Sequence, residues 1–262
     1  MKSVVRRLLH GKPTEEAILL RDANQFPRFT PHRFTYRGMN IEVSDFLSVA
    51  WQIAEIFGEE RLKFESKNPS PVILDCGANV GIAALYFSRL FPQAQLHCFE
   101  PENRVLNCLK NNLSSNQVTT AKVHEKAVWI NNDGVNFGGE GADGGSVYHE
   151  KNSQKVPSVR LKDVLGGFER VDVLKMDIEG AEVEVLKDCG DSLKKIKYLY
   201  VEYHSFQNRP QQLDQLLGLL AELGFRYQLK TIGHIAHHPF LGLPADLEMD
   251  IQLDIHAINE RI

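Results

Sequence analysis

The stretch PVILDCGANVGIAALYF, residues 71–87, combines a short apolar segment, a turn with two glycines and a second apolar segment. A short, wholly apolar strand is typical of a parallel sheet that is buried on both faces. Gly77 and Gly81 allow the backbone to turn sharply and to approach a ligand closely. The N–H groups at the start of the following helix favour a carboxylate or a phosphate. The stretch therefore predicts a ligand-binding turn at the carboxyl end of a buried strand.

Strands and helices alternate from this stretch onward, which predicts an α/β fold with a mainly parallel, doubly wound sheet. The expected strands lie at residues 71–76, 95–100, 121–130, 171–177, 196–204, 225–232 and 250–259. The expected helices lie at residues 81–91, 101–113, 181–189 and 210–225. Residues 131–153 are rich in glycine and are expected to form a mobile loop or a hairpin.

Residues 1–65 are expected to form a partly helical N-terminal extension or cap, and residues 66–262 the main domain. Apolar residues at helical spacing predict a helix within residues 43–62, with Ser44, followed by Asp45, as its N-cap. The phenylalanine-containing stretch FPRFTPHRF, residues 26–34, lacks a wider basic patch. We therefore expect it to be buried against the domain rather than to bind nucleic acid.

The composition is that of an ordinary globular protein, with 43% apolar residues and a formal charge of -4 over 262 residues. This charge gives no strong field to attract nucleic acid or an acidic membrane. No stretch approaches the roughly 20 apolar residues of a membrane-spanning helix, and the N-terminus does not resemble a signal peptide. Four scattered cysteines predict reduced thiols and a cytoplasmic location. The apolar extension makes a homodimer possible.

The glycine turn differs from the dinucleotide-binding pattern G-x-G-x-x-G, because Asn79 stands where close approach of a pyrophosphate needs glycine. The carboxylate of Asp75, just before the turn, would bind a cation rather than an anion. A ligand with both an ammonium and a carboxylate fits, and the methionyl tail of S-adenosylmethionine is such a ligand. Glu100 ends the next strand and can accept hydrogen bonds from ribose hydroxyls. An NAD-dependent oxidoreductase and a non-catalytic binding module on the same fold remain the alternatives.

Four segments, VILDCGANVGIAALYF, CFEPE, VDVLKMDIEGAEVEVLK and YLYVEYH, resemble the FkbM family of S-adenosylmethionine-dependent methyltransferases over about residues 70–230. The resemblance implies a class I methyltransferase (Rossmann-like) fold with seven strands in the order 3-2-1-4-5-7-6, the last antiparallel. It implies O-methylation of a hydroxyl on a sugar or another small metabolite. It also implies ligand contacts by position: Asp75, Gly77, Asn79 and Gly81 with the methionyl end, Glu100 with the ribose, Ala127 with the adenine, and Gly144–Ser146 near the cofactor.

The carboxyl ends of the fourth and fifth predicted strands carry four candidate catalytic residues. Asp177 and Glu179 are expected at the end of the fourth strand, and Glu202 and His204 at the end of the fifth. Residues two apart on a strand share a face, so each pair is expected to point the same way. Ends of neighbouring parallel strands meet at one edge, and we expect the four groups to converge there with perturbed pKa values.

Methyl transfer to a hydroxyl requires that the acceptor lose its proton, to a base or with the help of a metal. In the favoured mechanism His204 is the general base and Asp177 orients the acceptor or the ammonium of the cofactor. In the less favoured mechanism Asp177, Glu202 and His204 bind a divalent metal. Glu182 and Glu184, on the following helix, are expected to form a solvated face.

Overall fold

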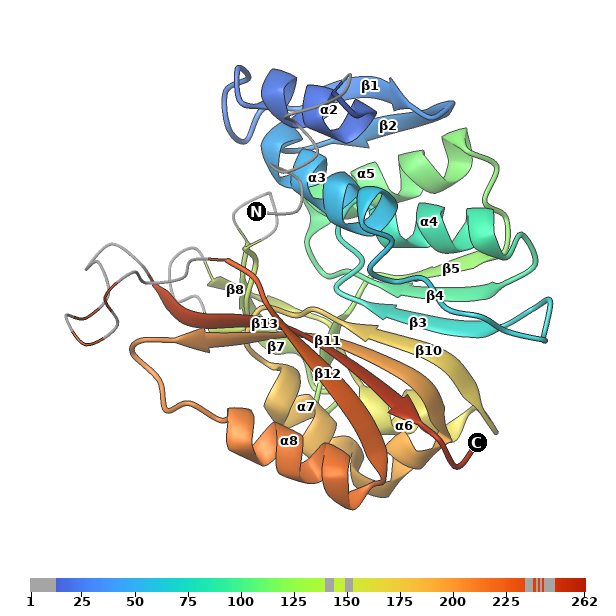
Figure 1. Ribbon diagram of the computed structural model, residues 1–262, viewed down its shortest axis with the longest axis vertical. Helices are drawn as coiled ribbons and strands as arrows, with labels where there is room; N and C mark the ends of the chain where they lie inside the picture. The colour runs from blue at the N-terminus through green and yellow to red at the C-terminus, as the bar shows by residue number, and fades with distance from the viewer. Residues whose placement is uncertain are drawn as a thin grey trace.

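The computed structural model describes residues 13–139, 144–148, 153–233 and 248–262, together with positions 238, 240 and 242. A seven-stranded sheet crosses the molecule, in the order β12-β13-β11-β10-β3-β4-β5 (Figure 1). Its strands are β3 (Val72–Cys76), β4 (Gln95–Phe99), β5 (Ala121–His124), β10 (Val171–Met176), β11 (Ile196–Phe206), β12 (Phe225–Thr231) and β13 (Met249–Asn259).

The strand order is the one implied by the resemblance. Counted along the chain, the seven strands of this sheet lie in the order 3-2-1-4-5-7-6 when the sheet is followed from β5 to β12. The pairs β3–β4, β4–β5, β3–β10 and β10–β11 are parallel. The last strand, β13, inserts between β11 and β12 and is antiparallel to both. The predicted class I methyltransferase topology is thus confirmed.

Helices cover both faces of the sheet (Figure 1). One face carries α4 (Ile82–Leu90) and α5 (Asn103–Ser115), and the other carries α6 (Leu161–Gly166), α7 (Glu182–Cys189), η2 (Gly190–Lys195) and α8 (Leu213–Glu222). Alternate residues of one strand enter different cores, since Ile73 packs with the α4–α5 side and Leu74 with the α7–α8 side. This double burial explains why consecutive residues of β3, which point to opposite faces, are both apolar before Asp75.

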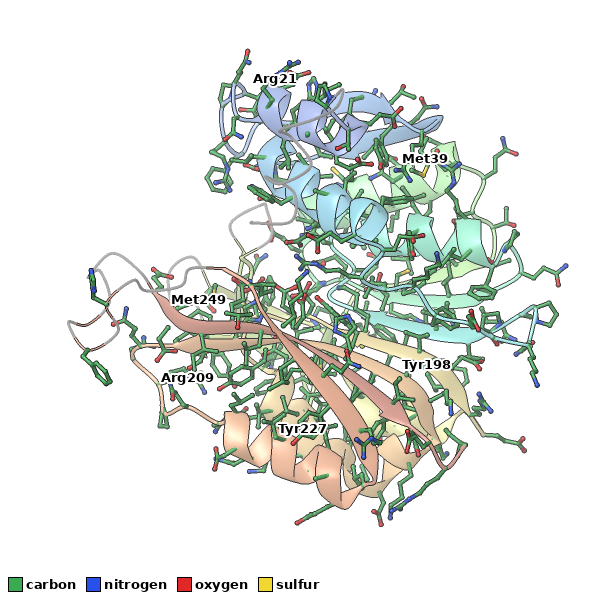
Figure 2. All side chains as sticks on the ribbon, in the orientation of Figure 1. Arg21, Met39, Tyr198, Arg209, Tyr227 and Met249 are labelled. Carbon is green, nitrogen blue, oxygen red and sulfur yellow. The ribbon has the colours of Figure 1, made fainter. Side chains whose placement is uncertain are left out.

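The N-terminal extension consists of α2 (Glu15–Ala23), the hairpin β1 (His32–Tyr36) and β2 (Met39–Val43), α3 (Phe46–Ile53) and the π-helical turn η1 (Ala54–Gly58). The N-cap of α3 is Asp45 and not Ser44 as expected, because the Oδ1 of Asp45 accepts a hydrogen bond from Ser48 N at 3.0 Å. Asn112 of α5 fastens the hairpin, accepting from Glu42 N at 2.7 Å and donating to Glu42 O at 2.8 Å. Met39, the first residue of β2, is buried in the same core as residues of α4 and α5 (Figure 2). The extension therefore shares a core with the α4–α5 face.

Two expectations about local structure were wrong in part. Phe26 and Phe29 stay 42% and 41% exposed, so the stretch at residues 26–34 is not wholly buried. The third predicted strand breaks after His124, because the chain leaves the main sheet there. Its second half, β6 (Ala127–Trp129), pairs in parallel with β9 (Ser158–Arg160) instead.

Within the glycine-rich region, β7 (Val135–Gly138) and β8 (Ser153–Val156) form an antiparallel hairpin. The hairpin alternative is thus confirmed for the described part, while residues 140–143 and 149–152 lie outside it. All four cysteines are buried and carry free thiols. Among the residues that the structure describes, no helix has the length and apolar composition needed to cross a membrane.

Candidate active site

The glycine turn lies between β3 and α4, and neighbouring protein atoms require both of its glycines. Gly77 has φ +77, and a Cβ there would lie 1.7 Å from the carbonyl oxygen of Asp177. Gly81 has φ +91, and a Cβ there would lie 2.6 Å from Leu109 Cδ1 in α5. The first glycine therefore lets β3 and β10 end close together, and the second lets α5 pack against the start of α4.

Asp75 is buried beneath the turn and pairs with a lysine. Lys175 Nζ lies 3.2 Å from Asp75 Oδ1 and 3.3 Å from Asp177 Oδ2, and donates to Gly77 O at 2.9 Å. Burial raises the pKa of Asp75, while the charge of Lys175 opposes that rise. The lysine thus joins the ends of β3 and β10. A contact between Asp75 and a ligand remains a prediction.

Glu100, at the end of β4, connects the glycine turn to α5. Its Oε2 accepts from Asn79 N at 2.9 Å, and its Oε1 accepts from Glu102 N at 2.9 Å. Burial raises the pKa of Glu100 to about 7. Each carboxylate oxygen has a further lone pair, so the carboxylate can accept ribose hydroxyls without releasing the turn.

Ala127 and Ser146 lie beyond the main sheet. Ala127 is buried in β6 against Phe137 and Val156, and its N–H donates to Pro157 O at 2.9 Å. Its predicted contact with adenine stays a prediction. Ser146 is fully buried, and its Oγ donates to the carbonyl oxygen of Glu179 at 2.6 Å. The glycine-rich region is thereby fastened to the turn that follows β10.

The four candidate catalytic residues meet around the buried ring of His204. Its Nε2 lies 3.6 Å from Glu179 Oε2 and 3.5 Å from Glu202 Oε1, and its Nδ1 lies 3.2 Å from Glu182 Oε1. Burial alone would lower the pKa of His204, but Glu179, Glu182 and Glu202 together raise it well above its usual value. The three surrounding carboxylates therefore stabilise the protonated form of the imidazole.

The carboxyl groups around this ring have different proton affinities. Burial and then the charge of Glu202 raise the pKa of Asp177 to about 7, although Lys175 and His204 oppose this. Burial also raises the pKa of Glu179 well above its usual value. For Glu202, burial is outweighed by the hydrogen bond and charge of His204, and its pKa falls to about 2. Neighbouring groups of one kind thus titrate in different pH ranges.

Two kinds of local structure, a strand and a turn, place these residues in the cluster. Glu202 and His204 share one face of β11, as strand alternation predicts. The strand β10 ends at Met176, so Glu179 does not lie on a strand as expected. It sits in a turn with φ +56, a left-handed conformation that costs a non-glycine residue on the order of 1 kcal/mol. The bond from Ser146 to the Glu179 carbonyl helps to hold this conformation.

The prediction that Glu182 is solvated was wrong. Its side chain is completely buried in the first turn of α7, where Oε1 accepts from Ile178 N at 3.1 Å and from Gly180 N at 3.0 Å. An acid in the first helical turn, after the segment DIEG, is the signal that could have found it, because free N–H groups gather there. The neighbouring Glu184 keeps 37% of its side chain exposed.

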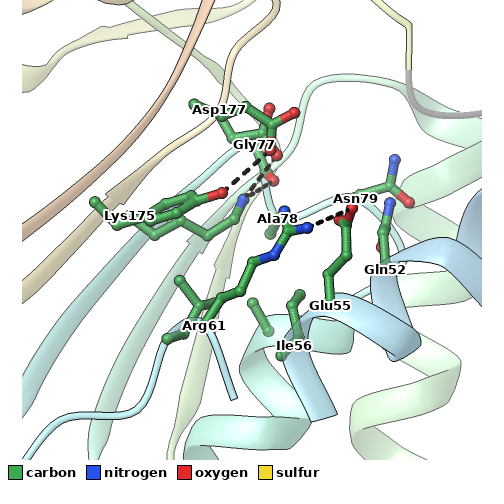
Figure 3. A pocket seen from close by; sticks show the side chains of 13 residues that line it. Gln52, Glu55, Ile56, Arg61, Gly77, Ala78, Asn79, Lys175 and Asp177 are labelled. Carbon is green, nitrogen blue, oxygen red and sulfur yellow. Dashed lines mark hydrogen bonds and ion pairs between the residues drawn. The ribbon is translucent and has the colours of Figure 1, made fainter. Parts of the chain in front are cut away.

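A cavity opens between the extension and the carboxyl edge of the sheet (Figure 3). The glycine turn forms one wall, and Arg61 and Glu55 of the extension point toward it from another. Lys175, Asp177, Tyr200 and Glu202 complete the lining. The cavity therefore joins the predicted cofactor turn, the catalytic cluster and the extension.

The strand order, the glycine turn after the first strand and the acid after the second define a class I methyltransferase domain. A family model described as the methyltransferase FkbM domain matches residues 75–227, which is more than half of the chain. The chain belongs to this family.

Curated relatives match parts of the chain. The 2-O-methyltransferase NoeI of Sinorhizobium fredii is 31% identical over an alignment of 159 positions, and the match covers 52% of this chain and 65% of that protein. The hexuronic acid methyltransferase AglP of Haloferax volcanii is 25% identical over an alignment of 175 positions, and the match covers 64% of this chain and 71% of that protein. The chain thus spans just under two thirds of the length of NoeI.

A solved structure of an FkbM methyltransferase from Methylobacillus flagellatus aligns with a TM-score of 0.48 and 18% identity, over 74% of this chain and 45% of that one.

Proposed function

We propose that this protein transfers a methyl group from S-adenosylmethionine to a hydroxyl of a sugar or another small metabolite. The observation that carries the proposal is the gathering of the glycine turn, Glu100 and the His204 cluster at one edge of the sheet. The activities after which NoeI and AglP are named support a sugar as the acceptor class. Asn79 in the turn and the family match both disfavour the NAD-dependent alternative.

S-adenosylmethionine supplies a methyl group on a sulfonium, which makes the sulfur a good leaving group. In our proposal Gly77, Asn79 and Gly81 border its methionyl end. The carboxylate of Glu100 accepts the ribose hydroxyls, and Ala127 borders the adenine. The fit is supported by Glu100, whose oxygens already face the turn and keep acceptor capacity. The protein contributes chiefly by holding donor and acceptor in line.

We assign the removal of the acceptor proton to Asp177. The side chain of His204 is 0% exposed, which keeps the ring away from an acceptor, and the surrounding carboxylates favour its protonated form over the neutral form that a base needs. Asp177 keeps 26% of its side chain exposed, lines the cavity and has a pKa of about 7, which suits a general base. Glu179 and Glu202 then hold the ring of His204 and its charge beside Asp177. These three are therefore positioning residues.

A metal-assisted mechanism is the second candidate. Asp177, Glu179 and His204 each offer one ligand atom, and these atoms lie within 4.8 Å of one another. Glu179 here takes the place of Glu202 in the predicted set. Carboxylates with one imidazole suit Mg or Mn. His204 would have to give up its proton to bind the ion, which the surrounding carboxylates oppose.

Calorimetric titration with S-adenosylmethionine, S-adenosylhomocysteine and NAD tests the proposal. Binding of the two sulfur ligands without binding of NAD supports it and justifies a screen of hydroxylated acceptors. Binding of NAD alone would restore the oxidoreductase alternative. Failure of all three to bind would favour a non-catalytic module. Turnover that is lost in EDTA and restored by Mg would favour the metal mechanism over Asp177 as the base.

We also propose a role for the extension, a location for the enzyme and a class of acceptor. Residues 1–65 act as a cap, because the described part of the extension borders the cavity. The four free thiols support a cytoplasmic location. The acceptor is a small molecule rather than a nucleic acid or a membrane lipid.

A further inference from the structure

The cavity holds more negative than positive charge. Three carboxylates line it, Glu55, Asp177 and Glu202, against two cations, Arg61 and Lys175. Both cations also face carboxylates outside the lining: Lys175 pairs with Asp75, and Arg61 pairs with Glu59 and Asp254. The cavity therefore favours a ligand that carries positive charge on the group entering it.

Two of the three carboxylates already have another partner or another role. Glu202 lies 3.5 Å from His204 Nε2 and accepts from Gln252 Nε2 at 2.7 Å. Asp177 lies 3.3 Å from Lys175 Nζ and, under the proposed function, takes the proton of the acceptor. Glu55 has Arg61 as its one ion-pair partner among the described residues, at 2.9 Å. Glu55 is thus the cavity carboxylate that can take a new cation.

The fold directs Glu55 into this position. It lies in η1, the π-helical turn that ends the helix of the extension, and such turns often occur at functional sites. Arg61 is itself largely buried and fixed by Asp254 Oδ2 at 3.0 Å, so it holds the Glu55 carboxylate beside the glycine turn (Figure 3). Burial raises the pKa of Glu55 to about 7, although Arg61 opposes this. The charge of a bound cation would stabilise the ionised carboxylate further.

We propose that Glu55 of the N-terminal extension binds the ammonium group of the methionyl tail, opposite the glycine turn. The extension would then supply a cofactor-binding residue as well as a cover. This inference rests on the proposed function, because it names a partner for one group of the same cofactor. An ammonium beside Glu55 also leaves Asp177 available as the base.

The test compares two ligands that differ only in the amino-acid tail, S-adenosylhomocysteine and 5′-methylthioadenosine. Calorimetry with the full chain is run about one pH unit above the pKa of Glu55, where its carboxylate is mostly ionised. Glu55→Gln should weaken S-adenosylhomocysteine binding about tenfold or more, as for a lost charge-assisted bond. It should leave methylthioadenosine binding unchanged within about twofold.

Glu59→Gln is the matched control. Glu59 also pairs with Arg61, at 3.0 Å, and the substitution removes the same charge, but Glu59 does not line the cavity. Binding of both ligands to this variant should stay close to that of the wild type. Urea unfolding of each variant reports whether the fold is kept.

Unchanged S-adenosylhomocysteine binding in Glu55→Gln would overturn the inference, as would an equal loss for both ligands. Equal weakening in Glu59→Gln would overturn it too, because the effect would then be one of general charge. If the wild type binds the two ligands normally, such results leave the proposed function intact. If the wild type binds neither, the proposed function fails first, and the inference fails with it.

Discussion

Nδ1 of His204 lies 3.2 Å from Oε1 of Glu182, and both side chains are completely excluded from solvent. The same carboxylate accepts hydrogen bonds from the backbone of Ile178 and Gly180. One buried acid therefore ties the turn after β10 to the strand β11. The charge of the catalytic cluster and the shape of the turn depend on the same group.

Glu182→Gln is expected to destabilise the protein by about 1–3 kcal/mol, because an amide cannot satisfy the backbone donors and the ring of His204 together. Urea unfolding measures this loss. Glu184→Gln, two residues along the same helix and partly exposed, should cost much less. Equal midpoints for Glu182→Gln and the wild type would show that the buried pair contributes nothing to stability.

Stability should depend on pH through His204. Its pKa in the folded protein is raised above the usual 6.5, so its contribution is complete below about pH 6.5. The contribution is lost as the pH rises through the folded-state pKa. The difference in unfolding free energy between the wild type and His204→Gln should therefore shrink as the pH is raised from about 6 to about 9. A difference that grows over this range would show that the ring is neutral in the folded state.

Gly77→Ala should be far more damaging than Gly38→Ala. The two glycines have almost the same φ, +77 and +78, but a Cβ at Gly38 meets nothing within 4 Å whereas one at Gly77 would overlap the Asp177 carbonyl. Gly38→Ala should cost about 1–2 kcal/mol for its left-handed backbone. Gly77→Ala should cost more than about 4 kcal/mol, or prevent folding, since the ends of β3 and β10 must separate. Soluble yield and urea unfolding compare the two, and similar losses would contradict the close approach at Gly77.

Asp177→Asn should lower turnover about 100-fold or more while S-adenosylhomocysteine affinity changes only a few fold. An amide keeps the size of the side chain but takes up no proton. In the wild type, turnover should rise as the pH passes through about 7, where Asp177 ionises, and this rise should disappear in the variant. Initial rates over a range of pH, with a hydroxylated acceptor found by screening, provide the measurement. An unchanged rate at saturating substrate would remove Asp177 from the role of base.

The topology could be predicted because it rests on local patterns. The mainly apolar segments that became β3, β4, β10 and β11 are each followed by a helix, and such alternation predicts a parallel sheet. The place of β13 came from the family resemblance, since nothing local to residues 249–259 shows that this strand inserts between two others. The break between β5 and β6 was missed because both halves have strand-like composition and differ only in their pairing partners.

The candidate site was predictable where it follows strand periodicity. Glu202 and His204 share a face of β11, as expected. The burial of Glu182 depends on long-range packing against His204, 22 residues away, and the helix pattern alone cannot show this. Glu55 was missed for a similar reason, because the apolar residues of its helix predict packing against the domain and give no sign of a carboxylate in the site. Only the π-helical turn and the ion pair with Arg61 bring its carboxylate to the cavity.

The position of β13 has a consequence for how the chain is made. It occupies the place between β11 and β12, yet it is the last of the seven strands to be synthesised. Until residues 249–259 leave the ribosome, β11 presents an unpaired edge, β12 has no neighbour in the sheet and Arg61 lacks Asp254. Such an edge is prone to pair with other chains, so the nascent protein should be a substrate for chaperones until its final strand is released.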